Sequence, residues 1–166
     1  FKSMTVRENV IVSHHLRSKA SLLGFFFGSA QAKADEAEFG KSADDIIDFL
    51  GLQAIRNEMA SNLPQGHLRA LGMAIGLATQ PEIILLDEPF AGVDPLAVLE
   101  IQRIIGFLKA RGIGVLITDH NVRETLGICD RAYIISDGTV LAEGTAQQII
   151  DNAEVRKVYL GENFRM

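Results

Sequence analysis

The chain has 166 residues, which is enough for one or two small domains, and 48% of them are hydrophobic and 22% charged, as in a packed globular protein. The formal net charge of −5 provides no basic footprint, so we expect no nucleic-acid partner. No apolar stretch reaches the ~18 residues that a membrane-spanning helix needs. Cys129 is the single cysteine, so these residues cannot form an internal disulfide.

The first 62 residues predict a mainly helical region. Thr5 and Glu8 have the spacing of a capping box, in which each residue's side chain binds the other's backbone amide at the start of a helix. Gly51 follows apolar residues at helical spacing and is typical of a helix end. The predicted elements are a helix over about 5–17, a loop over 18–30, a helix over 32–50 and a further helical turn over 54–60.

From residue 63 onward, strands and helices alternate, which indicates half of a parallel α/β sheet with helices on its faces. The strands are continuous apolar runs, as expected of parallel strands that are buried on both faces. Pro95 suits a first helical turn, and Asp137-Gly138 is a hairpin signal. The predicted elements are helix 66–79, strand 82–87, helix 95–110, strand 113–118, helix 121–128, strand 131–136, a hairpin strand from 139, and helices 145–151 and 153–160.

Two adjacent carboxylates, Asp87 and Glu88, end the first of these strands. Side chains alternate along a strand, so the two point in different directions and need not do the same job. One could hold a cation through water while the other aligns an attacking water, and phosphoryl transfer beside Mg²⁺ needs both tasks. On these residues alone, a strand that runs into a solvated acidic turn is the alternative.

His120 ends the next strand along the chain. Ligands of open α/β sheets bind outside the carboxyl ends of the strands, so Asp87, Glu88 and His120 should meet at one edge if the two strands are neighbours. A neutral imidazole there can form a hydrogen bond with a γ-phosphate or with the attacking water. Taken alone, His120 would be interpreted as a histidine satisfied at a strand end; taken with the two carboxylates, it indicates a site.

Together these segments resemble the ATP-binding subunit of an ABC transporter, and the resemblance covers essentially the whole chain. Residues 83–88 resemble the Walker B strand with its catalytic glutamate, residues 91–94 the D-loop, and His120 the switch histidine. Leu63-Pro64-Gln65-Gly66-His67, the signature-like loop, stands where the family has Leu-Ser-Gly-Gly-Gln. The resemblance implies a partial P-loop NTPase (RecA-like) parallel sheet flanked by helices, plus an all-helical ABC subdomain. It assigns residues 1–80 to that subdomain with the signature-like loop, and residues 81–166 to the C-terminal half of the ATPase core.

The family's roles transfer to matching residues. Asp87 is then expected to hold Mg²⁺ through water, Glu88 to polarise the attacking water, His120 to contact the γ-phosphate and Asp94 to organise a dimer interface. The signature-like loop opens a helix whose N-terminus would bind the ATP of the opposite subunit, since free amides and the helix dipole attract anions. A helix N-terminus without a ligand is the alternative. The nucleotide-binding residues expected in trans are Leu63, Gln65, Gly66 and His67.

The phosphate loop of the family, Gly-x-x-x-x-Gly-Lys-Ser/Thr, does not occur in these residues. The family places it, and the Q-loop glutamine, ahead of the segment that Phe1 to Glu8 resembles. We therefore expect the C-terminal two-thirds or so of a nucleotide-binding domain, which alone binds ATP weakly and does not hydrolyse it. The N-terminal half resembles branched-chain amino acid importers and the C-terminal half resembles the ATPase of lipopolysaccharide export, with the change near residues 85–89. This pattern predicts a chimera or a natural mosaic.

The resemblance implies an ATP-hydrolysing subunit that uses ATP and Mg²⁺ to power transport of branched-chain amino acids or lipopolysaccharide. A second ATPase subunit and transmembrane permease subunits are the implied partners, at the cytoplasmic face of the inner (plasma) membrane. The permease contact has the apolar candidates Phe1, Met4, Val6 and Phe25–Phe27; inward packing of these residues is the alternative. The alternatives are a nucleotide-free interaction or dimerisation fragment, and a soluble ABC ATPase that has no membrane partner.

Overall fold

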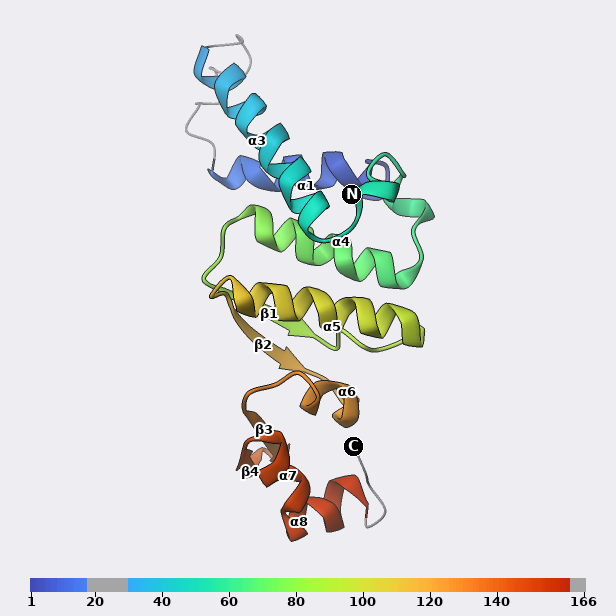
Figure 1. Ribbon diagram of the computed structural model, residues 1–166, viewed down its shortest axis with the longest axis vertical. Helices are drawn as coiled ribbons and strands as arrows, with labels where there is room; N and C mark the ends of the chain where they lie inside the picture. The colour runs from blue at the N-terminus through green and yellow to red at the C-terminus, as the bar shows by residue number, and fades with distance from the viewer. Residues whose placement is uncertain (18–29, 162–166) are drawn as a thin grey trace. The chain divides into compact units, whose positions relative to one another are not determined.

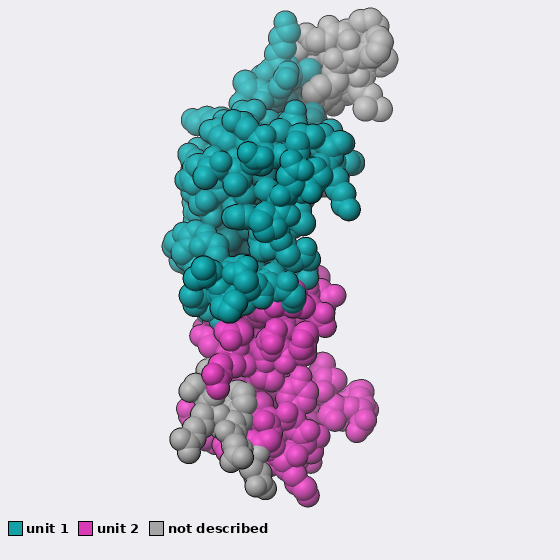
Figure 2. Space-filling view, turned by 90° about the vertical axis from the view of Figure 1, so that its right-hand side faces the viewer, with its two compact units in different colours: residues 1–84, 92–116 teal, residues 85–91, 117–166 magenta. Residues whose placement is uncertain are grey.

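The computed structural model describes residues 1–17 and 30–161 (Figure 1). The predicted loop, with Phe25–Phe27, lies outside the described residues apart from residue 30, which begins a helix. The chain divides into two compact units, which Figure 2 colours separately. The first unit comprises residues 1–84 and 92–116, and the second comprises residues 85–91 and 117–166. The boundary at residue 80, between the expected helical subdomain and the expected half of the ATPase core, stays a prediction.

Among the residues of the first unit that the structure describes, the main elements are the α-helices α1, α3, α4 and α5, whose apolar residues recur at helical spacing. Helix α1 packs on α3 and α4, α3 also packs on α4, and α4 packs on α5, beside which it runs in Figure 1. The buried positions of α5, Ile101, Ile104, Ile105 and Leu108, form one face of that helix. The bounds are α1 (Val6–Ser13), η1 (His14–Arg17), α3 (Ala30–Phe49), η2 (Gln53–Ile55), η3 (Ala60–Asn62), α4 (Gln65–Ala78) and α5 (Pro95–Ala110).

The chain ahead of α1 is hydrogen-bonded to the chain ahead of the signature-like loop. The amides of Val6 and Arg7 donate to the carbonyl oxygens of Glu58 and Arg56, both at 3.0 Å. In the other direction, the amide of Ala60 donates to the carbonyl of Met4 at 2.9 Å, and that of Ser61 to the carbonyl of Lys2 at 3.1 Å. Val6 is completely buried, so it packs inward and is not a partner contact.

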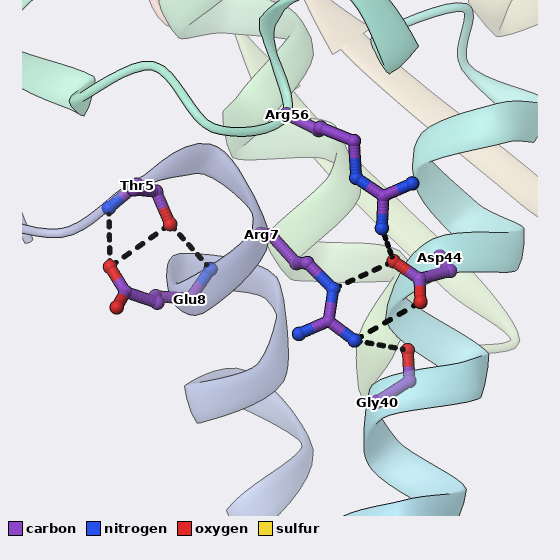
Figure 3. A network of polar contacts seen from close by, with 6 residues as sticks. All are labelled: Thr5, Arg7, Glu8, Gly40, Asp44 and Arg56. Atoms are coloured by element: carbon purple, nitrogen blue, oxygen red, sulfur yellow. Dashed lines mark hydrogen bonds and ion pairs between the residues drawn. The ribbon is translucent and has the colours of Figure 1, made fainter.

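Polar side chains reinforce the same junction (Figure 3). Thr5 and Glu8 form the predicted capping box of α1. Arg7 donates from Nε and Nη2 to the two carboxylate oxygens of Asp44 on α3, at 2.8 and 3.0 Å. Arg56 also donates to Asp44, so one carboxylate joins α1, α3 and the segment that leads to the signature-like loop. The Arg7 guanidinium holds the pKa of Asp44 below its usual range.

Strands β1 (Ile83–Asp87) and β2 (Gly114–Thr118) pair with each other. The Gly114 amide donates to the Glu82 carbonyl at 2.8 Å, which joins the start of β2 to the start of β1. The Glu88 amide donates to the Thr118 carbonyl at 2.7 Å, which joins the end of β1 to the end of β2. The pair is therefore parallel, as the sequence predicts.

The prediction that β1 and β2 are buried on both faces is wrong. Ile83 is 64% exposed, Leu85 72% and Leu116 58%, while Ile84, whose side chain takes the opposite face of β1, is buried. An apolar run predicts that a strand can be covered on both faces, but burial depends on what packs against it. In the part of the chain that the structure describes, only one face of β1 is packed.

A hairpin and short helices build the second unit. Asp137 and Gly138 both have positive φ, 50° and 75°, so they form the type I′ turn that their sequence predicts between β3 and β4. Leu126, Ile134, Ile149 and Val155 form the core. The predicted helix 153–160 is a short α-helix that continues as a π-helical turn. The bounds are α6 (Val122–Leu126), β3 (Ala132–Ser136), β4 (Thr139–Gly144), α7 (Ala146–Asp151), α8 (Ala153–Val155) and η4 (Arg156–Leu160).

Candidate active site

Glu88 and His120 lie together in the second unit, as the parallel-strand argument predicts. Glu88 directly follows β1, His120 is the second residue after β2, and the two strands end at the same edge. The Nδ1 atom of His120 is 3.5 Å from Oε1 of Glu88. Both side chains face solvent, at 63% and 57% exposure, so a ligand can reach both groups. We refer to Asp87, Glu88 and His120 as the strand-end site.

Asp87, the residue expected to hold Mg²⁺, has Thr118 as its neighbour. Its Oδ1 accepts a hydrogen bond of 2.5 Å from the hydroxyl of Thr118, the last residue of β2. The sequence analysis did not identify Thr118. A signal was present, because the final residues of two paired parallel strands lie side by side and Thr118 directly precedes the Asp119-His120 pair.

Glu88 adopts a backbone conformation that a non-glycine residue rarely adopts. Its φ is 46°, in the left-handed region, which costs about 1–2 kcal/mol for an L-residue. Two backbone bonds hold it there: its amide donates to Thr118, and its carbonyl accepts from Ala91 at 3.2 Å. Strain of this kind persists only where the surroundings enforce it, and in this conformation the Glu88 carboxylate lies beside His120.

Asp119 is a second polar residue at this edge that the sequence analysis missed. Its side chain has no exposed surface. One carboxylate oxygen accepts from the Phe90 amide at 2.9 Å, and the other accepts from the Asn121 amide at 2.8 Å. The second bond is a local Asx turn, which the Asp-His-Asn sequence could have indicated. The first bond joins residues that are 29 positions apart, and no local pattern predicts it.

The signature-like loop lies in the first unit and opens α4. Position 64, which precedes the helix, is a proline, and no side chain caps the helix there. The N-terminus of this 14-residue helix therefore offers amides and a dipole to an anion. Gln65 and His67 are exposed, whereas Leu63 is buried, with an exposed fraction of 9%. Leu63 can thus contribute its backbone to a ligand but not its side chain.

Gly66 has a packing role within the first unit. A Cβ atom at this position would lie 2.5 Å from Cβ of Ala97, in the first turn of α5, so only glycine fits. Asp94 caps that same turn, because its Oδ1 accepts from the amides of Leu96 and Ala97, both at 3.0 Å. A cavity of about 360 Å³ is lined by Gly66, His67 and Asp94 among other residues. The structure thus joins the signature-like loop to the predicted D-loop aspartate.

The donors at the strand-end site fit a metal ion that arrives with a phosphate. No group of three or more His, Cys, Asp or Glu side chains among residues 1–17 and 30–161 could hold a metal ion. Mg²⁺ keeps several waters and binds one or two carboxylates together with substrate phosphates. The exposed carboxylate of Asp87 is a donor of the kind that this arrangement needs.

Comparisons with known proteins identify relatives along the whole chain. The family model described as "ABC transporter" matches residues 1–91, and the model described as "Branched-chain amino acid ATP-binding cassette transporter" matches residues 139–165. The lipopolysaccharide export system ATP-binding protein LptB of Acidithiobacillus ferridurans is 56% identical over 123 residues, which are 74% of this chain and 51% of the relative. LptB of Escherichia coli strain K12 is 41% identical over all 166 residues, which correspond to 63% of its length.

Solved structures agree with these relatives. A nucleotide-free ATP-binding cassette from an ABC transporter matches 97% of this chain and 64% of its own, with a TM-score of 0.78 and 30% identity. An ATP-binding cassette of an ABC transporter in its ADP conformation matches with a TM-score of 0.76 and the same identity. The α/β fold class and the family predicted from the sequence are confirmed.

The expected change of relatives near residues 85–89 stays a prediction. The branched-chain model matches the C-terminal end, where the sequence analysis expected the likeness to lipopolysaccharide export, and the Escherichia coli relative covers both halves. This chain spans 51% and 63% of the two relatives' lengths. Within the described residues, no helix is both long and apolar enough to cross a membrane. The family model over residues 1–91, with these relatives, shows that the chain belongs to the ABC transporter family of ATP-binding proteins.

Proposed function

We propose that the full-length protein binds and hydrolyses ATP as the nucleotide-binding subunit of an ABC transporter. The observation that carries the proposal is the contact of 3.5 Å between His120 and Glu88, at the ends of two parallel strands in a member of this family. Both groups are exposed to an incoming ligand. The relatives from two organisms carry names that describe ATP-binding proteins, which supports the choice of nucleotide.

In this proposal Glu88, Asp87 and His120 divide the work on the terminal phosphate. Glu88 accepts a hydrogen bond from the attacking water and polarises it, a contribution worth about 10²–10⁴-fold in rate for a positioned base. His120 donates a hydrogen bond to the γ-phosphate oxygens on which charge accumulates. Asp87 would hold Mg²⁺ beside the phosphates. The ion supplies neutralisation of phosphate charge when it is bound.

The signature-like loop serves a second copy of the chain. The free amides at the start of α4, at Gln65, Gly66 and His67, bind the γ-phosphate of the ATP that the other subunit holds, and Leu63 contributes through its backbone. The uncapped N-terminus of the helix supports this role. Asp94, which caps α5 beside Gly66, contributes to the interface of that dimer.

Lipopolysaccharide is the cargo that the comparisons favour. The relatives in Acidithiobacillus and Escherichia are named as ATP-binding proteins of that system, and one of them matches all 166 residues. The branched-chain alternative is supported by the family model over residues 139–165. Permease subunits at the cytoplasmic face of the inner membrane are the proposed partners. Phe1, 74% exposed on the segment ahead of α1, is available for that contact.

The test is phosphate release by the full-length protein with Mg-ATP. Glu88→Gln should lower kcat by about 100-fold or more while ATP binding persists. Glu82→Gln, an exposed carboxylate ahead of the same strand, is the matched control and should retain the wild-type rate. Equal rates in the Glu88→Gln and wild-type proteins would remove Glu88 from the reaction. A wild-type protein that binds no nucleotide would favour the dimerisation fragment.

The cargo is tested separately, with the full-length protein and its co-purified membrane subunits in vesicles. Lipopolysaccharide should change the ATP hydrolysis rate of these vesicles, and leucine should leave it unchanged. A response to leucine alone would reassign the cargo to the branched-chain amino acids while the proposal of ATP hydrolysis stands.

A further inference from the structure

We propose that Asp119 is a positioning residue that holds Glu88 and His120 in their working arrangement. The inference rests on the proposed ATP hydrolysis and adds a residue to it. Asp119 contacts neither the water nor the phosphate in this proposal. It acts on two turns of the backbone, one on each side of the strand-end site.

The burial of Asp119 distinguishes it from its neighbours. Its carboxylate is completely shielded from solvent, while the side chains of Glu88 and His120 are more than half exposed. A carboxylate out of water is costly unless hydrogen bonds compensate it. Here one oxygen accepts the Phe90 amide and the other accepts the Asn121 amide, so each oxygen has a partner. Charge-assisted bonds of this kind are the stronger class.

The two amides that donate to Asp119 belong to the turns that carry Glu88 and His120. Phe90 lies two residues after Glu88, and Asn121 is the residue after His120. A single carboxylate therefore fixes both turns at a set separation. The turn that carries Glu88 needs such support, because the positive φ of Glu88 is a strained conformation that relaxes when its surroundings loosen.

A purely local role does not account for the geometry. An Asx turn at the start of α6 would need the bond to Asn121 alone. The bond to Phe90 crosses 29 positions and brings in the other strand's turn. Asp119 forms no direct hydrogen bond with the imidazole, because its Oδ1 lies 3.8 Å from Nδ1 of His120, so its hydrogen bonds go to the backbone alone. The backbone is the route by which Asp119 reaches both residues.

Asp119→Asn in the full-length protein is the first test. An asparagine side chain has one acceptor oxygen, so one of the two amides loses its partner and faces an NH₂ group. We expect kcat for ATP to fall about 10- to 100-fold, because a small misplacement of catalytic groups has effects of that size. KM for ATP should stay within about twofold, since Asp119 does not touch the nucleotide. Asp119→Ala, which removes both acceptors, should lower kcat further.

Hydrogen exchange provides a readout that does not depend on turnover. In Asp119→Ala the amides of Phe90 and Asn121 should exchange faster, while amides of the β3–β4 hairpin keep their wild-type rates. Asp137→Asn, at the exposed turn of that hairpin, is the matched control and should change neither kcat nor these exchange rates. All rates are compared at a temperature at which circular dichroism shows each variant fully folded.

The outcomes separate this inference from the proposed function. If wild-type protein hydrolyses ATP and Asp119→Asn retains its kcat, Asp119 is not a positioning residue. Unchanged exchange at Phe90 and Asn121 in Asp119→Ala would overturn the inference in the same way. If wild-type protein does not hydrolyse ATP, the proposed function fails, and the role of Asp119 in it fails as well.

Discussion

The strand-end site and the signature-like loop offer a ligand different parts of the polypeptide. The strand-end site presents three exposed side chains: the carboxylate of Asp87 at the end of β1, and the carboxylate of Glu88 and the imidazole of His120 just beyond the ends of their strands. The signature-like loop presents the start of a helix, and its fixed feature is a glycine packed on Ala97. The first site should therefore be sensitive to side-chain chemistry, and the second to the space around its backbone.

His120→Ala should have the largest effect, because it removes a side chain from the strand-end site. We expect kcat for ATP in the full-length protein to fall about 100- to 1,000-fold, the usual loss for one donor to a developing charge. His67→Ala in the signature-like loop leaves the backbone amides in place and should cost less than about tenfold. His15→Ala is the control for a histidine outside both regions. A larger loss for His67→Ala than for His120→Ala would reverse the comparison.

Gly66→Ala should have the next largest effect, because the added methyl group meets Ala97 at 2.5 Å. Overpacking of this kind costs about 1–3 kcal/mol in the free energy of unfolding, which urea denaturation measures. Ala97→Gly opens the same space. Adding Gly66→Ala to the Ala97→Gly variant should therefore lower the free energy of unfolding much less than adding Gly66→Ala to the wild type. Additive effects would show that the two positions do not compete for that space.

The double variant also separates packing from ligand binding. If stability and ATP hydrolysis both recover, glycine at position 66 serves the contact between α4 and α5. If stability recovers and hydrolysis does not, the methyl group at position 66 interferes with the nucleotide itself, and the backbone amides need close access to it.

The elements that the sequence predicts well are those with local signals. Pro95, at a first helical turn, predicts a helix over 95–110, and α5 has those bounds. Asp137-Gly138 predicts the hairpin through its tolerance of positive φ. The rule that parallel strands end at one edge brings Glu88 and His120 together before any coordinates exist.

What the sequence does not predict depends on contacts between distant residues. The bond from Phe90 to Asp119 and the fit of Gly66 against Ala97 each join residues far apart in the chain. The exposed face of β1, with Ile83 and Leu85, was mispredicted for a related reason. An apolar residue shows that burial would be favourable, but it does not show which segment covers it.

Asp94→Ala tests whether the predicted interface residue acts on its own helix or on a second subunit. The loss of the cap on α5 in Asp94→Ala should cost about 1 kcal/mol in the free energy of unfolding. Asp94→Asn should keep most of the wild-type stability, because asparagine also caps helices well. ATP-dependent dimerisation of the full-length protein is measured alongside, by light scattering. Dimerisation that weakens in both variants would assign the charge of Asp94 to the interface, whereas dimerisation that follows stability would leave the cap as its whole role.

Asp44→Asn should have the smallest effect, and it compares two carboxylates that hold parts of the molecule in place. Asp119 is buried and accepts from amides, whereas Asp44 is 33% exposed and accepts from Arg7 and Arg56. Water screens the Asp44 pairs, so we expect a loss of about 0.5–1 kcal/mol in the free energy of unfolding at pH 7. Asp45→Asn, at the exposed neighbouring position on α3, is the control and should stay within about 0.5 kcal/mol of wild type.

The pH dependence identifies the ionised form of Asp44 as the stabilising one. The hydrogen bond from Arg7 lowers the pKa of Asp44, and burial opposes it with a smaller effect. A carboxyl whose pKa is lower in the folded protein binds protons more readily in the unfolded chain, so its stabilisation is complete above its ordinary pKa of about 4. That stabilisation is lost as the pH falls through the lower folded value. The stability difference between wild type and Asp44→Asn should therefore be constant from pH 7 to 5 and shrink below about pH 4, and a constant difference down to pH 3 would assign the loss to packing instead of charge.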